Sequence, residues 1–441
     1  MGDHTASLAW VQQKVLEPLT LALSRLESLG DPRAASMILR QCFSACKLNY
    51  IMRTAAPIVA GSAADIMDPL LRVCWGNILG HVCSDAEWAL SSLPIRLGGA
   101  GITSPSTVCA AAALSSWLSA CSDAPPGLPI LAPDGLASCV THLATVAPAL
   151  GIPLRDATSG SADPVQALRR HALLPQWRDQ SAWSEELFKV RAASFDSAVS
   201  ERLMGLRRAQ SSSGAGLWLT APIMGGPAFS AVEWQLLLRL RSGAPCFPTS
   251  ASCNGCGSQM DAMGDHALCC AHNGMYRRHN HIRDTLFHLS ASAHWNPALE
   301  QALPGTSTRP ADILLRGLSV KPVAVDVTVT HPLRLSASVA VRVGTVSAAA
   351  ESERHKVSVN KVACAAAGWD FLPFGVDALG GLGPSARSLC QKLAKHLAMQ
   401  AGASTSSNAL SVGQHISLAL AKGRGEMLSA ASPVRPGPLS V

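Results

Sequence analysis

Four residues of types that commonly bind metal ions lie within a short cysteine-rich stretch of the sequence. They follow the pattern C-x2-C-x9-H-x3-C and are Cys253, Cys256, His266 and Cys270. Zinc prefers four thiolate or imidazole ligands in a tetrahedron, and two cysteines separated by two residues can hold one ion from a tight turn. Gly255 and Gly257 favour such a turn. The pattern therefore predicts a closed, structural zinc site.

The identity of the fourth zinc ligand is open. Cys269 could replace Cys270, and Cys246 or His272 could take the place of another ligand. The simpler alternative is a set of small buried core residues, because free cysteines usually behave as hydrophobic side chains. The convergence of four potential ligands in so short a stretch favours zinc over that alternative.

A basic segment follows directly, at residues 274–289. Its polar side chains include Arg277, Arg278, His279, Asn280, His281 and Arg283. Leu286 and Leu289 add an apolar face, so we expect a helix. Arginine at this density suits contacts with the phosphates of nucleic acid. A solvent-exposed helix face without a ligand would have the same composition, and that alternative stays open.

Two aspartates interrupt apolar, β-branched runs that otherwise predict strands. The three strands are expected at 294–300, 310–316 and 322–330. Asp312 and Asp326 lie in the second and third, where adjacent strands of a hairpin would bring both carboxylates together. A magnesium ion could bridge them there and activate water for attack on a phosphate, with Glu300 as a third oxygen ligand. The alternative is a turn or edge position, with a salt bridge to Arg309 or Arg316.

Two lysines on the next predicted helix are candidates for phosphate chemistry. The helix is expected at about 345–367, and a strand at 369–376 and a helix at 384–400 follow it. This order of elements resembles the core of restriction-endonuclease-like nucleases, in which a lysine activates the attacking water or stabilises charge on the phosphate. The resemblance implies such a lysine here, with Lys356 the first candidate and Lys361 the second. The alternative for both is a solvated helix face.

The overall composition limits the class of protein. The chain has 441 residues, of which 48% are hydrophobic and 15% charged, so it is not broadly disordered. No stretch is long and apolar enough for a membrane span. The fourteen cysteines are diluted in a chain without a secretory signal pattern, so we expect a reduced, intracellular protein. The net charge of 36 − 29 = +7 favours an anionic partner only mildly.

Periodicity and composition predict a multi-domain α+β protein. We expect a mostly α-helical N-terminal half, a small zinc module and a C-terminal α/β domain. The expected parts are a helical region at 1–121, a linker at 122–165, a helical connector at 166–245, the zinc module at 246–273, the α/β domain at 274–400 and a flexible tail at 401–441. Proline and polar residues suggest the linker, and a Ser, Gly and Ala composition suggests the tail.

Several motifs together resemble the carboxy-terminal part of site-specific non-LTR retrotransposon polyproteins. The resemblance is carried by Cys253 onward, Arg278-His279-Asn280, Arg309-Pro310-Ala311-Asp312, Val325-Asp326-Val327 and Gly368-Trp369-Asp370-Phe371. More weakly, KLNYIMRT and LPIRLGGAGI resemble the region between the polymerase palm and the zinc knuckle. The resemblance implies a thumb-like helical region, a CCHC zinc knuckle and a restriction-endonuclease-like domain of the PD-(D/E)XK type.

That family implies an endonuclease that nicks target DNA, with catalytic magnesium, structural zinc and a nuclear location. DNA and element RNA would be its partners. No Asp-Asp dipeptide of a polymerase palm occurs in the chain, so we expect no polymerase activity, and a separate component would supply it. Two positions depart from the nuclease signature, because Ala311 is inserted before Asp312 and Thr328 stands at the lysine position.

Those departures favour an alternative, a catalytically inactive, zinc-dependent nucleic-acid-binding remnant of a retroelement. A hydrolase with a nucleophilic serine has no support, because the sequence lacks a G-x-S-x-G motif.

Overall fold

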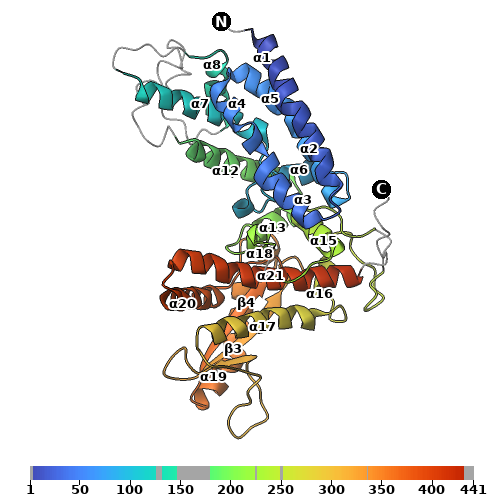
Figure 1. Ribbon diagram of the computed structural model, residues 1–441. Helices are drawn as coiled ribbons and strands as arrows, with labels where there is room; N and C mark the ends of the chain where they lie inside the picture. The colour runs from blue at the N-terminus through green and yellow to red at the C-terminus, as the bar shows by residue number, and fades with distance from the viewer. Residues whose placement is uncertain are drawn as a thin grey trace. The chain divides into compact units, whose positions relative to one another are not determined.

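The computed structural model describes residues 3–125, 132–146, 179–223, 226–248, 252–334 and 336–431. Within them the protein is mostly α-helical, with one small mixed sheet (Figure 1). The chain divides into two compact units, Met1–Ala198 and Val199–Val441. This division falls inside the helical connector expected at 166–245, of which residues 166–178 lie outside the described residues.

The first unit is built from helices in the part of the chain that the structure describes. They are α1 (His4–Val11), α2 (Glu17–Glu27), α3 (Pro32–Ile38), α4 (Asn49–Thr54), α5 (Pro57–Leu79), α6 (Asp85–Ser91), α7 (Pro105–Asp123), α8 (Leu136–Val146) and α12 (Gln180–Ala198). Helix α7 begins at a Ser104 cap and contacts α4, α5, α8 and α12. Its alanines allow this close packing, since Ala111 and Ala112 are completely buried.

Helix α8 corrects the linker expected at 122–165. Leu136, Val140 and Leu143 recur at helical spacing and are buried in a cluster with Leu118 of α7. This segment therefore forms part of the core of the first unit. Residues 126–131 and 147–165 of the expected linker lie outside the described residues.

The second unit combines helices with the sheet. Its helices are α13 (Glu201–Gln210), α14 (Leu217–Thr220), α15 (Ala231–Ser242), α16 (Asp265–Cys269), α17 (Met275–Ser292), α18 (Val339–Arg342), α19 (Ala348–Ala366), α20 (Pro384–Ala401) and α21 (Thr405–Ala431). Its strands are β1 (Pro297–Leu299), β2 (Ile313–Leu315), β3 (Val323–Thr330) and β4 (Asp370–Asp377). The expected order of helix, three strands, helix, strand and helix is thus present from α17 to α20.

The sheet has the strand order β1-β2-β3-β4. The first three strands are antiparallel, and β4 runs parallel to β3 after the crossover through α19. Alternate residues of β3 face opposite sides of the sheet. Val325 and Val327 belong to the core that includes residues of α17, α20 and α21, whereas Ala324 packs with Cys364 of α19. Asp326 has the same parity as Ala324, which places it on the α19 side.

Helix α21 corrects the flexible tail expected at 401–441. It spans Thr405–Ala431 and contacts α14, α15, α16, α17 and α20, with Ile416 and Leu420 buried in the core of the sheet. A Cβ atom on Gly423 would lie 2.6 Å from Cα of Arg278 in α17. The glycines that suggest flexibility in the sequence therefore serve close helix packing here. Residues 432–441 lie outside the described residues.

Candidate active site and metal centre

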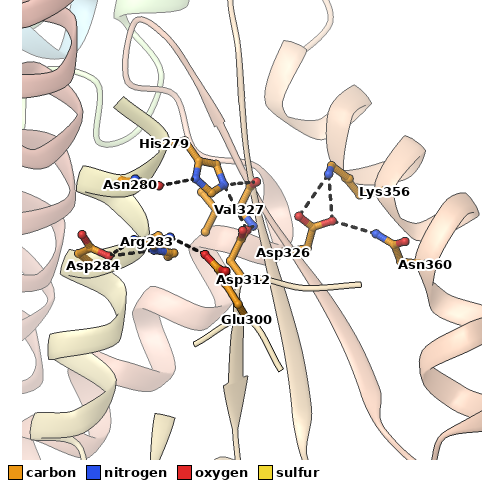
Figure 2. Close-up of polar contacts among 10 residues, drawn as sticks. All are labelled: His279, Asn280, Arg283, Asp284, Glu300, Asp312, Asp326, Val327, Lys356 and Asn360. Atoms are coloured by element: carbon orange, nitrogen blue, oxygen red, sulfur yellow. Dashed lines mark hydrogen bonds and ion pairs between the residues drawn. The ribbon is translucent and has the colours of Figure 1, made fainter. Parts of the chain in front are cut away.

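All but one of the residues expected to act on phosphate, Lys361 being the exception, line one cleft in the second unit. The cleft has a volume of about 470 Å³ and is lined by Glu300, Arg309, Pro310, Ala311, Asp312, Asp326, His355, Lys356, Val359 and Asn360. Figure 2 shows its central side chains between α17 and α19. The hairpin pairing of β2 with β3 brings Asp312 and Asp326 together, as the sequence predicts.

Asp312 directly precedes β2 and is held by its neighbour on β3. Its Oδ2 accepts a hydrogen bond from the Val327 backbone N–H at 2.7 Å and lies 3.2 Å from Nε2 of His279. Burial raises the pKa of Asp312, but His279, the Val327 N–H and the charge of Lys356 together outweigh it, so the pKa lies below its usual value. Both contacts involve Oδ2. Because its pKa is lowered, the Asp312 carboxylate is ionised at neutral pH. The residue is half-buried at the cleft.

Asp326 lies in the middle of β3 and contacts two side chains of α19. Nζ of Lys356 is 3.2 Å from Oδ1 and 3.1 Å from Oδ2, and Nδ2 of Asn360 donates to Oδ2 at 2.9 Å. Burial raises the pKa of Asp326, and the nearby charge of Asp312 adds to that rise, while Lys356 opposes it. The two aspartates therefore interact electrostatically.

Helix α19 distinguishes the two candidate lysines. Lys356 lines the cleft beside Asp326, whereas Lys361 is exposed and is not among the residues that line it. Asn360 was not predicted from the sequence, although it lies one helical turn after Lys356 and therefore on the same face. That i, i+4 spacing was the available signal.

Glu300 lines the same cleft, but two arginines bind its carboxylate. Nη1 of Arg283 is 3.0 Å from Oε1, and Nη1 of Arg309 is 3.2 Å from Oε2. Its backbone has φ +46°, a conformation that non-glycine residues rarely adopt. The arginine expected beside the aspartates, Arg309, thus pairs with Glu300. A role for Glu300 as a metal ligand would require release from both guanidinium groups.

The predicted nucleic-acid-binding residues on α17 differ in exposure and in their partners. Arg277 is exposed, whereas Arg283 contacts Asp284 as well as Glu300. His281 is 3.0 Å from the Glu426 carboxylate.

Arg278 corrects the prediction of a phosphate contact. Its side chain is buried, and Nη1 donates to the Leu268 carbonyl of α16 at 3.0 Å. Burial lowers the pKa of Arg278 to about 10. A guanidinium enclosed in this way joins α16 to α17 and cannot reach a phosphate.

His279 contacts Asp312, one of the aspartates of the cleft, and is only partly exposed to solvent. Its Nε2 lies 3.2 Å from both Oδ2 of Asp312 and the Val327 carbonyl oxygen, and Nδ1 lies 3.4 Å from Oδ1 of Asn280. Burial is the largest single influence and lowers the pKa of His279, but the contacts with Asp312, Asn280 and the Val327 carbonyl together raise it overall. Sequence analysis assigned His279 and Asn280 to nucleic-acid binding, and their observed partners are the aspartate and each other.

The Cys/His cluster forms a second polar centre, at the turn that precedes α16. One ligand atom from each of Cys253, Cys256, His266 and Cys270 lies within 4.8 Å of the others. The two Sγ atoms of Cys253 and Cys270 are 3.8 Å apart. Two thiolates that share one tetrahedral ion at about 2.3 Å are about 3.8 Å apart. The cluster can therefore bind a metal ion.

The alternatives for the fourth ligand do not join the cluster. The group of ligand atoms that lie within 4.8 Å of one another includes none of Cys246, Cys269 and His272. The Sγ of buried Cys246 lies 3.8 Å from the Leu236 carbonyl oxygen instead. Glycine is required in the ligand turn, because a Cβ on Gly255 would lie 2.8 Å from the His272 carbonyl oxygen. Among the described residues, the Cys/His cluster thus contains Cys270 and not Cys269.

No known protein-family model and no curated protein matches this chain. None of its described helices is long and apolar enough to cross a membrane. Functional assignment therefore depends on the chemistry of the cleft and of the Cys/His cluster.

Proposed function

We propose that the protein is a magnesium-dependent DNA endonuclease derived from a non-LTR retrotransposon, with a restriction-endonuclease-like domain. The single observation that carries this proposal is the convergence of Asp312, Asp326 and Lys356 in one cleft. The order of helices and strands around the cleft supports it. The proposed retrotransposon origin rests on the resemblance of the sequence motifs. The proposed reaction class rests on the side chains that line the cleft.

The donor set of the cleft suits a hard divalent cation. Asp312 and Asp326 offer carboxylate oxygens, which magnesium prefers. A bound magnesium ion would act as a Lewis acid on the phosphate and lower the pKa of a coordinated water. Lys356 lies where its amine can offset negative charge that develops on the phosphate, and Asn360 orients the Asp326 carboxylate.

The Cys/His cluster would have a structural role in the same protein. We propose zinc as its ion, because three thiolates and one imidazole form a common structural zinc site. Exposed Arg277 follows the cluster and could contact a phosphate. DNA, element RNA, a separate polymerase component and a nuclear location stay predictions of the resemblance.

Plasmid nicking with magnesium tests the nuclease. We expect Asp312→Asn and Asp326→Asn to lower the nicking rate by at least about 100-fold, because each removes a charged metal ligand. Asp370→Asn is the matched control, since Asp370 is exposed at the start of β4 and outside the cleft. Nicking that survives both cleft substitutions would contradict the proposal.

A second candidate function is nucleic-acid binding without catalysis. The observation that favours it is the ion pair in which Lys356 contacts both oxygens of Asp326, together with the two arginines on Glu300. These cations could replace a lost metal ion. Its signature would be DNA binding that weakens steeply with salt, with no cleavage in magnesium.

A further inference from the structure

We propose that helix α19 enters the major groove of duplex DNA, so that the strand in the cleft and the opposite strand lie on its two flanks. This inference rests on the proposed function, because it concerns the DNA that the cleft would cut, and it names a duplex as the substrate. Lys356 faces the strand in the cleft. Arg354 and Lys361, which have no part in the proposed chemistry, contact phosphates of the opposite strand.

Helix α19 leaves most of its surface uncovered. Its main contacts are with β3 and β4, whereas residues of α17, α20 and α21 pack together on the opposite face of the sheet. Its buried residues are Ala348, Ala349, Glu353 and Cys364. Val359 and Val362, by contrast, are 58% and 78% exposed. The helix therefore forms a ridge on the surface of the second unit.

The exposed part of this ridge carries cations and almost no acids. Between residues 354 and 366 the helix contains three Lys or Arg residues and no Asp or Glu. Glu351 lies in the first turn, before this stretch, and Glu353 is buried. Arg354 and Lys361 are exposed, and neither forms an ion pair with a residue that the structure describes. The ridge is therefore complementary in charge to a polyanion.

The cations lie on two flanks of the ridge. Arg354 and Lys361 are seven residues apart, about two helical turns, so they share one flank. Lys356 follows Arg354 by two residues, about 200° around the helix. Figure 2 shows Lys356 and Asn360 extending from α19 toward Asp326, on the flank that lines the cleft. The crest between the flanks includes exposed Val362, at about 80° from Arg354.

The shape of the ridge matches the major groove of B-DNA. That groove is about 12 Å wide and admits an α-helix, which with its side chains is about 10–12 Å across. The two strands border the groove, so cations on opposite flanks of one helix can each contact a different backbone. Ser358, Val362 and Ala365 are exposed and short, which allows the crest to approach the base edges. Val362 can contact thymine methyl groups there.

Single-stranded DNA would fit this ridge less well. One strand has one backbone, which the cleft would hold beside Lys356. Arg354 and Lys361 lie on the far flank of α19 from the cleft, so they would then have no phosphate to contact. We therefore expect a preference for duplex DNA that depends on Arg354 and Lys361 and not on the cleft.

Fluorescence anisotropy with labelled DNA tests the inference without cleavage. The full chain, with its Cys/His cluster loaded with zinc and no magnesium added, should bind a duplex at least about tenfold more tightly than either of its strands. Arg354→Ala and Lys361→Ala should each weaken duplex binding about three- to tenfold. Each should also lower the slope of log affinity against log salt by about one unit, because one phosphate contact is lost. The double variant should bind duplex and single strand about equally.

Val362→Glu tests the crest of the ridge independently. It should weaken duplex binding by at least about tenfold, because a carboxylate would enter a groove bordered by phosphates. The matched controls are Met399→Glu and Arg387→Ala, which change exposed residues of α20 on the other face of the sheet. Both should leave the duplex preference unchanged. Circular dichroism of each variant shows whether the fold is retained, and exposed positions of this kind should retain it.

The outcomes separate this inference from the nuclease proposal. Equal binding of duplex and single strand by the wild type, binding of neither, or unchanged duplex binding in the α19 variants overturns the inference even if magnesium-dependent nicking persists. Loss of duplex preference in the Arg354 and Lys361 variants supports the inference even in a protein that never nicks DNA.

Discussion

The Cys/His cluster and the cleft differ in how their polar groups are assembled and held. All four ligands of the cluster come from residues 253–270, at distances set by one turn and one short helix. The cleft gathers its groups from Glu300 after β1, the segment before β2, β3 and α19. Each aspartate in the cleft has a protein donor, since His279 contacts Asp312 and Lys356 contacts Asp326. Metal loss should therefore disorganise the cluster and leave the cleft in place.

The largest expected effect is on the cluster. Cys256→Ala should abolish stoichiometric zinc binding and expose residues 252–274 to amide hydrogen exchange. Zinc contributes about 10 kcal/mol or more to the folding of small zinc modules, which have little apolar core. Cys256 is exposed, so its loss removes a ligand rather than core packing. Metal analysis and hydrogen exchange measure the two effects.

Cys269→Ser is the control for that substitution. Cys269 neighbours a ligand but lies outside the Cys/His cluster, so the variant should retain one zinc ion per chain. The comparison between the two regions fails if Cys256→Ala exposes the cleft segments 312–330 as strongly as the cluster.

A smaller effect is expected where the two regions meet. Arg278 binds the α16 carbonyl of Leu268 and precedes His279, and Gly423 of α21 packs against it. Gly423→Ala would place a Cβ 2.6 Å from Cα of Arg278. We expect the free energy of unfolding of the second unit to fall by about 1–3 kcal/mol from overpacking, measured by chemical denaturation.

Gly61→Ala provides the matched helical substitution. A Cβ at Gly61 in α5 would meet nothing within 4 Å, so this change should be neutral or stabilise the first unit by about 0.5–1 kcal/mol. If both substitutions change the free energy of unfolding equally, close packing at Gly423 does not connect the Cys/His cluster with the cleft.

The difference between a cluster built from adjacent residues and a cleft built from distant segments explains which features could be predicted from the sequence. Cysteine spacing predicted the Cys/His cluster, because a tight turn depends on adjacent residues, but it left the fourth member open between Cys269 and Cys270. An apolar, β-branched run predicted β3, and hairpin pairing then predicted that Asp312 and Asp326 would meet. The contact between His279 and Asp312 was missed, because it depends on how α17 packs across the sheet, and no local pattern encodes that.

Composition was a poorer guide than spacing for the long helices. The Ser, Gly and Ala content of residues 401–441 predicted a flexible tail, yet Ile416 and Leu420 of α21 complete the core of the sheet. Small residues permit flexibility and close packing equally well. At Gly423, only the close approach of Arg278 shows that the glycine serves packing, and Arg278 is far away in the sequence.

The smallest expected effect comes from Asn360, which supports a cleft carboxylate without charge. Its amide donates to Oδ2 of Asp326 at 2.9 Å. Because one neutral hydrogen bond contributes about 1 kcal/mol, Asn360→Ala should slow nicking about fivefold at low magnesium. The magnesium concentration for half-maximal rate should rise, while the rate at saturating magnesium should change little, because Asn360 orients a ligand and does not touch the phosphate.

Lys392→Ala is the control for surface changes, since Lys392 is exposed on α20 and outside the cleft. Steady-state nicking across a magnesium titration separates the two roles of Asn360. A loss of about 100-fold that saturating magnesium does not restore would match removal of Asp326 itself. Asn360 would then contact the reacting phosphate, and the cleft would depend on a group that neither the carboxylates nor the lysine can replace.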